Sequence, residues 1–316
     1  MRISGFSFAK NAVKLYFPLK QAIESILPIV DEFIVAIGDN DPGDTTRQEV
    51  ESIRSSKIKI IDTVWDIEKY PRGTENAHQT DIAKSHCTGD WLFYVQADEV
   101  IHEKYLPTIR QRCEDLLDDR EVEGLLFDYK HFWGDYDHYH LSHGWYKQEI
   151  RIIRNDPDIH SWESAQSFRR IPGFDGRDYR QQEGTHKLKV ARAYADVYHY
   201  GWVRPPRTME KKTKALATIH KGKEVADALF AERAPVFDYG DMSKIPRFEG
   251  THPQVMQAFI QRFDWENQLR VGGSLPDTRP LFKHEKWKYK ALTWIEQNLA
   301  GGREIGGFHN YMLLDR

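Results

Sequence analysis

Residues 91–95, WLFYV, form an uninterrupted apolar run, and two carboxylates, Asp98 and Glu99, follow within four residues. Because the run has no polar face, it predicts a central strand of a parallel sheet that is covered on both sides. The carboxylates then lie at the carboxyl end of the strand, the edge where open α/β sheets bind ligands. Carboxylates at that edge suit a hard cation and the phosphates it holds. The alternative is that they form the solvated start of the next helix.

The first hundred residues alternate between strand-like and helix-like patterns. Strands are expected before this run at residues 2–8, 31–39 and 57–65, and helices at 13–27, 46–54 and 73–87. This order predicts parallel strands joined by right-handed crossovers, which is the architecture of a nucleotide-binding α/β domain.

The pattern changes after Glu103. Strands expected at residues 121–133, 145–155 and 189–200 indicate a mixed or antiparallel extension of the sheet. From Pro205 onward the sequence is mainly helical in pattern, with further helices expected at 253–269 and 282–299. We therefore predict an α/β domain over residues 1–205 and a mainly helical C-terminal extension over residues 206–316.

Composition excludes several classes of protein. A net charge of −3 argues against a nucleic-acid binder that neutralises phosphates. Cys87 and Cys113 are too few for a disulfide framework, so we expect reduced thiols and a cytoplasmic location. No run approaches the ~20 apolar residues that cross a bilayer, so neither secretion nor insertion is expected. Nine tryptophans and fifteen tyrosines leave peripheral membrane contact open, and a homodimer is also left open.

The order of five segments resembles the GT-A-type, family 2-like glycosyltransferases over roughly residues 1–215. The segments are SGFSFAKNA, DEFIVAIGDNDPGDTT, GTENAHQTDIAKSHCTGDW, FYVQADEVIHE and VYHYGWVRP. The resemblance implies a GT-A-like, mostly parallel sheet with helices on both faces. It also implies transfer of a sugar from a nucleotide-diphosphate donor to the hydroxyl of a saccharide or another acceptor.

In such enzymes an acidic D-x-D motif bridges a divalent metal, Mn²⁺ or Mg²⁺, to the donor's diphosphate. Here the triplet is Gln96, Ala97 and Asp98, so the resemblance implies Asp98 as the metal ligand. The amide of Gln96 can bond a ribose hydroxyl but adds no charge, so the metal is expected to bind together with the diphosphate. His199 is implied as a further metal ligand that would favour Mn²⁺, although a packing role is the alternative.

Other residues are candidates for binding the nucleotide sugar. Asp39 ends the second strand, whereas Asp44 in the following turn fits a helix cap. Asn76 and Gln79 fall on one face of the third helix. If that face points toward the cleft, either residue could contact the nucleotide. Cations that could neutralise the leaving diphosphate are Arg204, Lys211 and Lys212.

An inverting transferase also needs a carboxylate that takes the proton of the acceptor hydroxyl. Glu163 stands about where such enzymes carry this base, although relatives can carry the acid one position later, where this chain has Ser164. The His- and aromatic-rich segment 131–143 would suit stacking on acceptor sugars, and an aromatic hairpin is the alternative.

Two other functions compete with glycosyl transfer. A nucleotidyltransferase on a similar sheet would normally carry a glycine-rich loop after the first strand, and FSFAKNAVK lacks the glycines. A catalytically silent nucleotide- or carbohydrate-binding relative is the second alternative, because Gln96 replaces an acid. The helices after Pro205 could close over the donor, dimerise or meet a membrane-borne acceptor.

Overall fold

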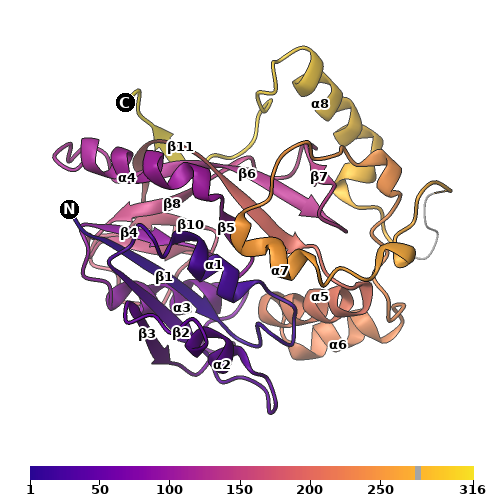
Figure 1. Cartoon of the computed structure of the whole chain (residues 1–316), viewed down its shortest axis with the longest axis horizontal. Coiled ribbons are helices and arrows are strands. Elements are labelled where there is room, and N and C mark those ends of the chain that lie inside the picture. Colours follow the sequence, from indigo (N-terminus) through magenta and orange to yellow (C-terminus); the bar gives the residue numbers. More distant parts are fainter. Residues whose placement is uncertain (275–278) are drawn as a thin grey trace.

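The computed structural model describes residues 1–274 and 279–316, and it is built around one mixed β-sheet (Figure 1). The strand order is β3-β2-β1-β4-β8-β6-β11-β10-β9, with β5 and β12 also paired to β11 and β7 paired to β6. The strands are β1 Ile3–Ala9, β2 Glu32–Ile37, β3 Ile58–Asp62, β4 Trp91–Tyr94, β5 Glu99–Ile101, β6 Gly124–Trp133, β7 Tyr139–His140, β8 Gln148–Arg154, β9 Ile159–Trp162, β10 Ser167–Arg170, β11 His186–Trp202 and β12 Tyr311–Leu313.

The N-terminal half has the predicted alternation of parallel strands and helices. Strands β1 to β4 pair in parallel, and the helices are α1 Leu19–Ile26, α2 Thr46–Glu51, α3 Thr74–Ser85 and α4 Leu106–Asp115. The helix expected from residue 13 is wrong at its start, because α1 begins only after Pro18. A proline disfavours helical geometry in the residue before it, and Tyr16 has a positive φ of 59°.

The sheet was expected to be mostly parallel, but it is mixed. Strand β8 runs antiparallel to both β4 and β6, so the parallel order ends directly beside β4. Across the described residues, five strand pairs are parallel and six are antiparallel. The short strands β5, β7, β9, β10 and β12 were not predicted, since each is too short to carry a clear alternation.

Helices cover both faces of the parallel half, as predicted. On one face Ile23 of α1 and Ile109 of α4 pack with Phe93 of β4. On the other face Ala83 of α3 packs with Leu92. The run 91–95 is therefore buried from both sides, which explains why it has no polar position.

A mainly helical C-terminal extension is not evident. The helices there are α5 Pro206–Lys221, α6 Lys223–Ala231, α7 Gln257–Ile260 and α8 Trp287–Asn298, and loops with single 3₁₀ turns join them. The helix predicted over 253–269 is reduced to α7, because Trp265 is buried and its Nε1 donates to the Gly134 carbonyl. Strand β12 then returns to β11. The domain boundary at residue 205 stays a prediction. None of the helices in the described ranges is long and apolar enough to span a bilayer.

Candidate ligand-binding cleft

A cleft of about 700 Å³ opens at the carboxyl ends of β1 and β4 and is closed on its far side by α5. We call it the strand-end cleft. Asp98 contributes to its lining together with His199 from the end of β11, so the chain has a cavity at the edge where the sequence predicts a site. Other polar or aromatic residues of the lining are Lys10, Asn11, Trp65, Asn76, Gln96 and Lys212.

Asp98 and His199 face each other within the cleft wall. Each is only 6% exposed, and Asp98 Oδ2 lies 3.8 Å from His199 Nε2. Gly201 makes this approach sterically possible. A Cβ at Gly201 would lie 2.5 Å from His199 Nε2 and 2.7 Å from Asp98 Oδ2, so any larger residue would push the two side chains away.

The hydrogen bonds behind His199 determine which of its ring nitrogens carries the proton. Burial lowers the pKa of His131 well below its usual range and the pKa of His199 to about 3, so both rings are neutral. His131 Nε2 lies 2.7 Å from the Tyr146 carbonyl oxygen, which only accepts, so this nitrogen carries the proton of His131. His131 Nδ1 must then accept from His199 Nδ1 at 2.9 Å.

This assignment leaves His199 Nε2 with an unshared lone pair that faces the Asp98 carboxylate. Two lone-pair donors at 3.8 Å do not hydrogen-bond each other, but they can hold one cation between them. A divalent cation would also compensate the buried charge of Asp98. Residues 1–274 and 279–316 contain no group of three or more His, Cys, Asp or Glu side chains arranged for a metal. The remaining ligands would therefore have to come from a bound anion or from water.

Two of the three predicted cations lie near these groups, Arg204 fully buried and Lys212 partly buried. Lys212 lines the cleft and donates to the Gly201 carbonyl at 2.9 Å, and burial, followed by the charge of Arg204, lowers its pKa to about 7. Arg204 is fully buried but does not line the cleft, and none of its three guanidinium nitrogens has a hydrogen-bond partner, although the group lies 4.5 Å above the Phe17 ring. Lys211 is exposed on α5 and lies outside the lining.

The remaining nucleotide-sugar candidates lie in different environments. Asn76 lines the cleft, whereas Gln79 is fully buried and donates to Glu75 Oε1 at 2.7 Å. Asp39 lies outside the lining and accepts from Lys10 Nζ and from the Trp65 backbone, at 2.8 and 2.9 Å. Asp39 therefore positions two residues that do line the cleft.

Gln96 holds the cleft wall together. Its Nε2 donates to the Ala165 carbonyl at 2.7 Å and its backbone N–H donates to Glu99 Oε2 at 3.1 Å. Asp44 was expected to cap the following helix, but the N-cap of α2 is Thr45; Asp44 lies one residue earlier and accepts from the Thr46 backbone at 2.8 Å.

Glu99 is neither a cleft residue nor the start of a helix. It begins β5 and forms a fully buried bidentate ion pair with Arg151, at 2.7 Å for both nitrogens. Tyr129 Oη donates to the same carboxylate at 2.8 Å. Sequence reasoning missed this pair, although Arg151, which lies between isoleucines in the segment EIRIIR, is a sign that a buried partner is needed.

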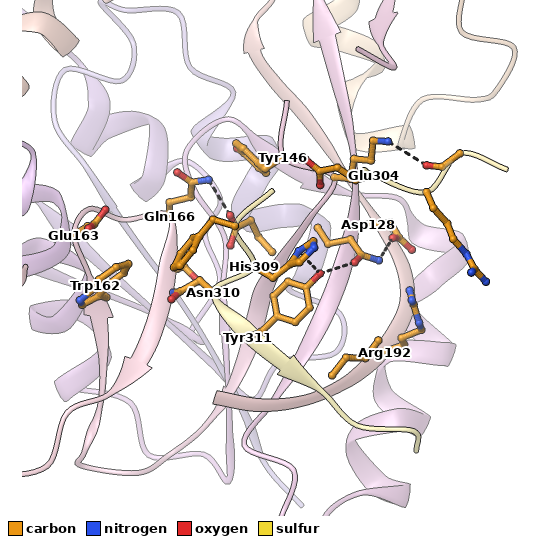
Figure 2. Close-up of a pocket in the computed structure, with 18 of the residues that line it drawn as sticks. Asp128, Tyr146, Trp162, Glu163, Gln166, Arg192, Glu304, His309, Asn310 and Tyr311 are labelled. Carbon is orange, nitrogen blue, oxygen red and sulfur yellow. Dashed lines mark hydrogen bonds between the residues drawn. The ribbon is translucent and has the colours of Figure 1, made fainter. Parts of the chain in front are cut away.

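A second cavity, of about 750 Å³, adjoins the strand-end cleft and shares Tyr146, Ser164 and Gln166 with it (Figure 2). Glu163 lies here and not in the strand-end cleft, with its carboxylate 3.9 Å from Arg180. Its φ of 60° is unusual for a residue with a side chain and fixes the direction in which the carboxylate leaves the loop.

The wall of the second cavity is completed by the end of the chain. The residues from β12 and the preceding loop that line it are Gly301, Gly302, Arg303, Glu304, Phe308, His309, Asn310, Tyr311 and Leu313. Trp162 lies on the same side as Glu163 (Figure 2), but it is only 6% exposed and the Arg169 guanidinium covers its ring at 3.7 Å. The cavity lining combines aromatic residues with several carboxylates and cations.

The His-rich segment 131–143 lines neither cavity. His131 pairs with His140 across β6 and β7, and His138 and His143 contact Asp135 and Glu296. The aromatic hairpin that was the alternative is therefore the arrangement observed.

Searches against protein families and curated proteins found no match. Among solved structures, the chain is similar to TarS 1-349 of S. aureus at 14% identity, over 73% of this chain and 70% of that chain, with a TM-score of 0.34. It is also similar to glucosyl-3-phosphoglycerate synthase from Mycobacterium tuberculosis in complex with Mn²⁺, UDP and phosphoglyceric acid. That match has 19% identity over 42% of this chain and 43% of the other, with a TM-score of 0.27. At these TM-scores the similarities carry no function over to this chain.

Proposed function

We propose that this protein is a glycosyltransferase of GT-A-like fold that moves a sugar from a nucleotide-diphosphate donor to an acceptor hydroxyl, with inversion. The donor would bind in the strand-end cleft, with a divalent cation, Mn²⁺ or Mg²⁺, bridging its diphosphate to Asp98 and His199. The acceptor would enter through the second cavity.

One observation carries the proposal. Asp98 Oδ2 and His199 Nε2 face each other as two lone-pair donors, at the strand edge where α/β sheets bind phosphate-bearing ligands. A pair of donors leaves most of a cation's coordination sphere to ligand oxygens, as a diphosphate-bound metal requires. The mixed imidazole and carboxylate set favours Mn²⁺ over Mg²⁺. The sugar-transfer chemistry rests on the resemblance of the sequence segments that surround these residues.

The reaction forms a bond between the acceptor oxygen and the anomeric carbon while the bond from that carbon to the diphosphate oxygen breaks. A bound cation would neutralise the charge that develops on the leaving diphosphate. Lys212, which lies in the same wall, would supply a second positive charge when protonated. Gln96 would keep the cleft wall in place through its bond to Ala165.

Glu163 is the proposed base that accepts the proton of the attacking hydroxyl. It lies in the second cavity beside Ser164, which lines both cavities. A hydroxyl held on the Trp162 side would therefore lie near the point where the two cavities meet.

The binding step is tested by thermal denaturation with UDP-, GDP- and dTDP-sugars, each with and without Mn²⁺. We expect stabilisation by one nucleotide class that depends on the metal. Asp98→Asn should remove the metal dependence, and Asp158→Asn, the same change on an exposed loop, should not. Indifference of the wild-type chain to every nucleotide would refute the proposal.

The chemical step is tested separately with Glu163→Gln, which should keep metal-dependent nucleotide binding and lose transfer or donor hydrolysis. If the wild-type chain binds a nucleotide sugar but never turns it over with any acceptor or with water, the catalytically silent alternative is correct.

A further inference from the structure

We propose that the outward face of α8 is a docking surface for an anionic lipid bilayer. The face consists of Trp287 and Trp294 with the flanking lysines Lys283, Lys286, Lys288 and Lys290, and we call it the Trp-Lys face. Helix α8 lies at the periphery of the molecule, away from the parallel strands β1 to β4 (Figure 1). The inference does not depend on the proposed transfer reaction.

The two tryptophans lie on the same side of α8 and point away from the protein. They are seven residues apart, which is close to two full turns at 3.6 residues per turn. Trp287 is 82% exposed and Trp294 is 58% exposed. Large apolar side chains rarely remain this accessible on one helix face without a partner.

The opposite side of α8 is fixed to the rest of the protein. The Thr293 hydroxyl accepts from the His143 backbone at 2.9 Å. Glu296 is fully buried and accepts from His143 Nδ1 at 2.7 Å and from Lys147 Nζ at 2.9 Å. The helix therefore cannot rotate to bury its tryptophans, and their exposure is a feature of the folded chain.

The charge around the tryptophans has one sign. All four lysines are exposed, and none pairs with a carboxylate within the described part of the chain. The acids of this segment are engaged elsewhere, since Glu285 pairs with Arg279 and Glu296 is buried. Exposed indoles flanked by lysines match the interface of an anionic membrane, where tryptophan lies at the headgroup level and lysine contacts lipid phosphates.

Further exposed apolar residues follow α8 along the chain. Of the fifteen large apolar side chains that are exposed in the described residues, seven lie between residues 287 and 313. Phe308, one of the seven, also lines the second cavity. The segment that contains α8 and β12 is therefore richer in exposed apolar side chains than the rest of the described chain.

A second copy of the chain is the less favourable occupant of this face. In a two-fold symmetric dimer the same patch meets itself, so lysines would face lysines. Like charges held opposite each other weaken such a contact. A bilayer that carries negative lipids avoids this repulsion and accepts both the indoles and the ammonium groups.

The test is flotation of the purified full-length chain with vesicles of phosphatidylcholine alone and of phosphatidylcholine mixed with phosphatidylglycerol. Two variants remove parts of the Trp-Lys face. The tryptophan pair is Trp287→Ser with Trp294→Ser. The lysine triple is Lys286→Gln, Lys288→Gln and Lys290→Gln. Two matched controls change exposed residues elsewhere, Val225→Ser with Leu229→Ser, and Lys69→Gln with Lys221→Gln and Lys244→Gln. The two lysine triples change the net charge equally.

We expect binding to the anionic vesicles and little to phosphatidylcholine alone. The lysine triple should lower the partition coefficient about a hundredfold, because each lysine near such a surface contributes about fivefold. The tryptophan pair should also release the protein, and both controls should bind as the wild type does. The inference is wrong if the wild-type chain floats with neither vesicle, or if the control triple reduces binding as much as the α8 triple. It is also wrong if the tryptophan variant only dissociates a dimer in solution.

Discussion

Replacing Glu149 by glutamine should make the stability of this protein less sensitive to pH. Glu149 is 7% exposed in β8, lines the second cavity and accepts from Gln166 Nε2 at 2.8 Å. Burial raises the pKa of its carboxyl from 4.5 to about 7, although the nearby Arg151 opposes the shift. Glutamine has the same shape and keeps an oxygen that can accept the bond from Gln166.

The direction of the effect follows from which state holds the proton. Between the unfolded pKa of 4.5 and the folded pKa of about 7, the folded chain binds more protons than the unfolded chain. Folding stability from this group is therefore present at low pH and is lost as the pH rises through that window. From about pH 5 to about pH 8 the loss amounts to about 2–3 kcal/mol.

Urea denaturation of the wild type and of Glu149→Gln at the two pH values measures this loss. Subtracting the change in unfolding free energy of the variant from that of the wild type removes the contributions of the other groups that titrate in the same range. We expect the wild type to lose about 2–3 kcal/mol more than the variant as the pH rises. Parallel pH dependence in the two proteins would mean that solvent reaches the carboxyl, and it would refute the reasoning from burial.

Three further predictions concern other parts of the structure. Gly201→Ala should leave the protein folded but abolish metal-dependent nucleotide binding in calorimetry, since the alanine Cβ would displace His199 and Asp98. Unchanged binding would contradict the role of Asp98 and His199 as the metal ligands. Arg151→Met should lower the free energy of unfolding by about 3–5 kcal/mol in thermal or urea denaturation, because it leaves the Glu99 charge buried and unpaired. A decrease below about 1 kcal/mol would show that the pair is solvated. Glu296→Ala should loosen α8 and the segment after it, because His143, Lys147 and the Ile305 backbone lose their common acceptor. Limited proteolysis should then cut the C-terminal segment faster than in the wild type. An unchanged cleavage rate would argue against this anchor.

The N-terminal half of the fold could be predicted because its signals are local. The run 91–95 is apolar at every position, and only a strand buried on both faces requires this. The start of the first helix was wrong because the prediction did not use Pro18, which directly precedes α1. The position of Asp98 at a cavity followed from the strand order alone, since parallel strands bring their carboxyl ends to one edge.

The parts that could not be predicted depend on contacts between distant residues. Glu99 and Arg151 are separated by 52 residues, and only the antiparallel placement of β8 brings them together. Gln79 was expected in the cleft with Asn76, but one turn further along α3 it is fully buried and bonded to Glu75, a contact within the helix that the spacing of the residues does not reveal. The second cavity needs the return of β12 to β11, and three residues of strand leave no pattern in the sequence.

The central claim is that Asp98 and His199 together hold a diphosphate-bound cation in the strand-end cleft. A crystal of the protein with Mn²⁺ and a nucleoside diphosphate, measured at a wavelength where manganese scatters anomalously, tests it most directly. We expect one anomalous peak in contact with Asp98 Oδ2, His199 Nε2 and the diphosphate oxygens. A nucleotide bound elsewhere, or manganese bound away from these two atoms, would contradict it.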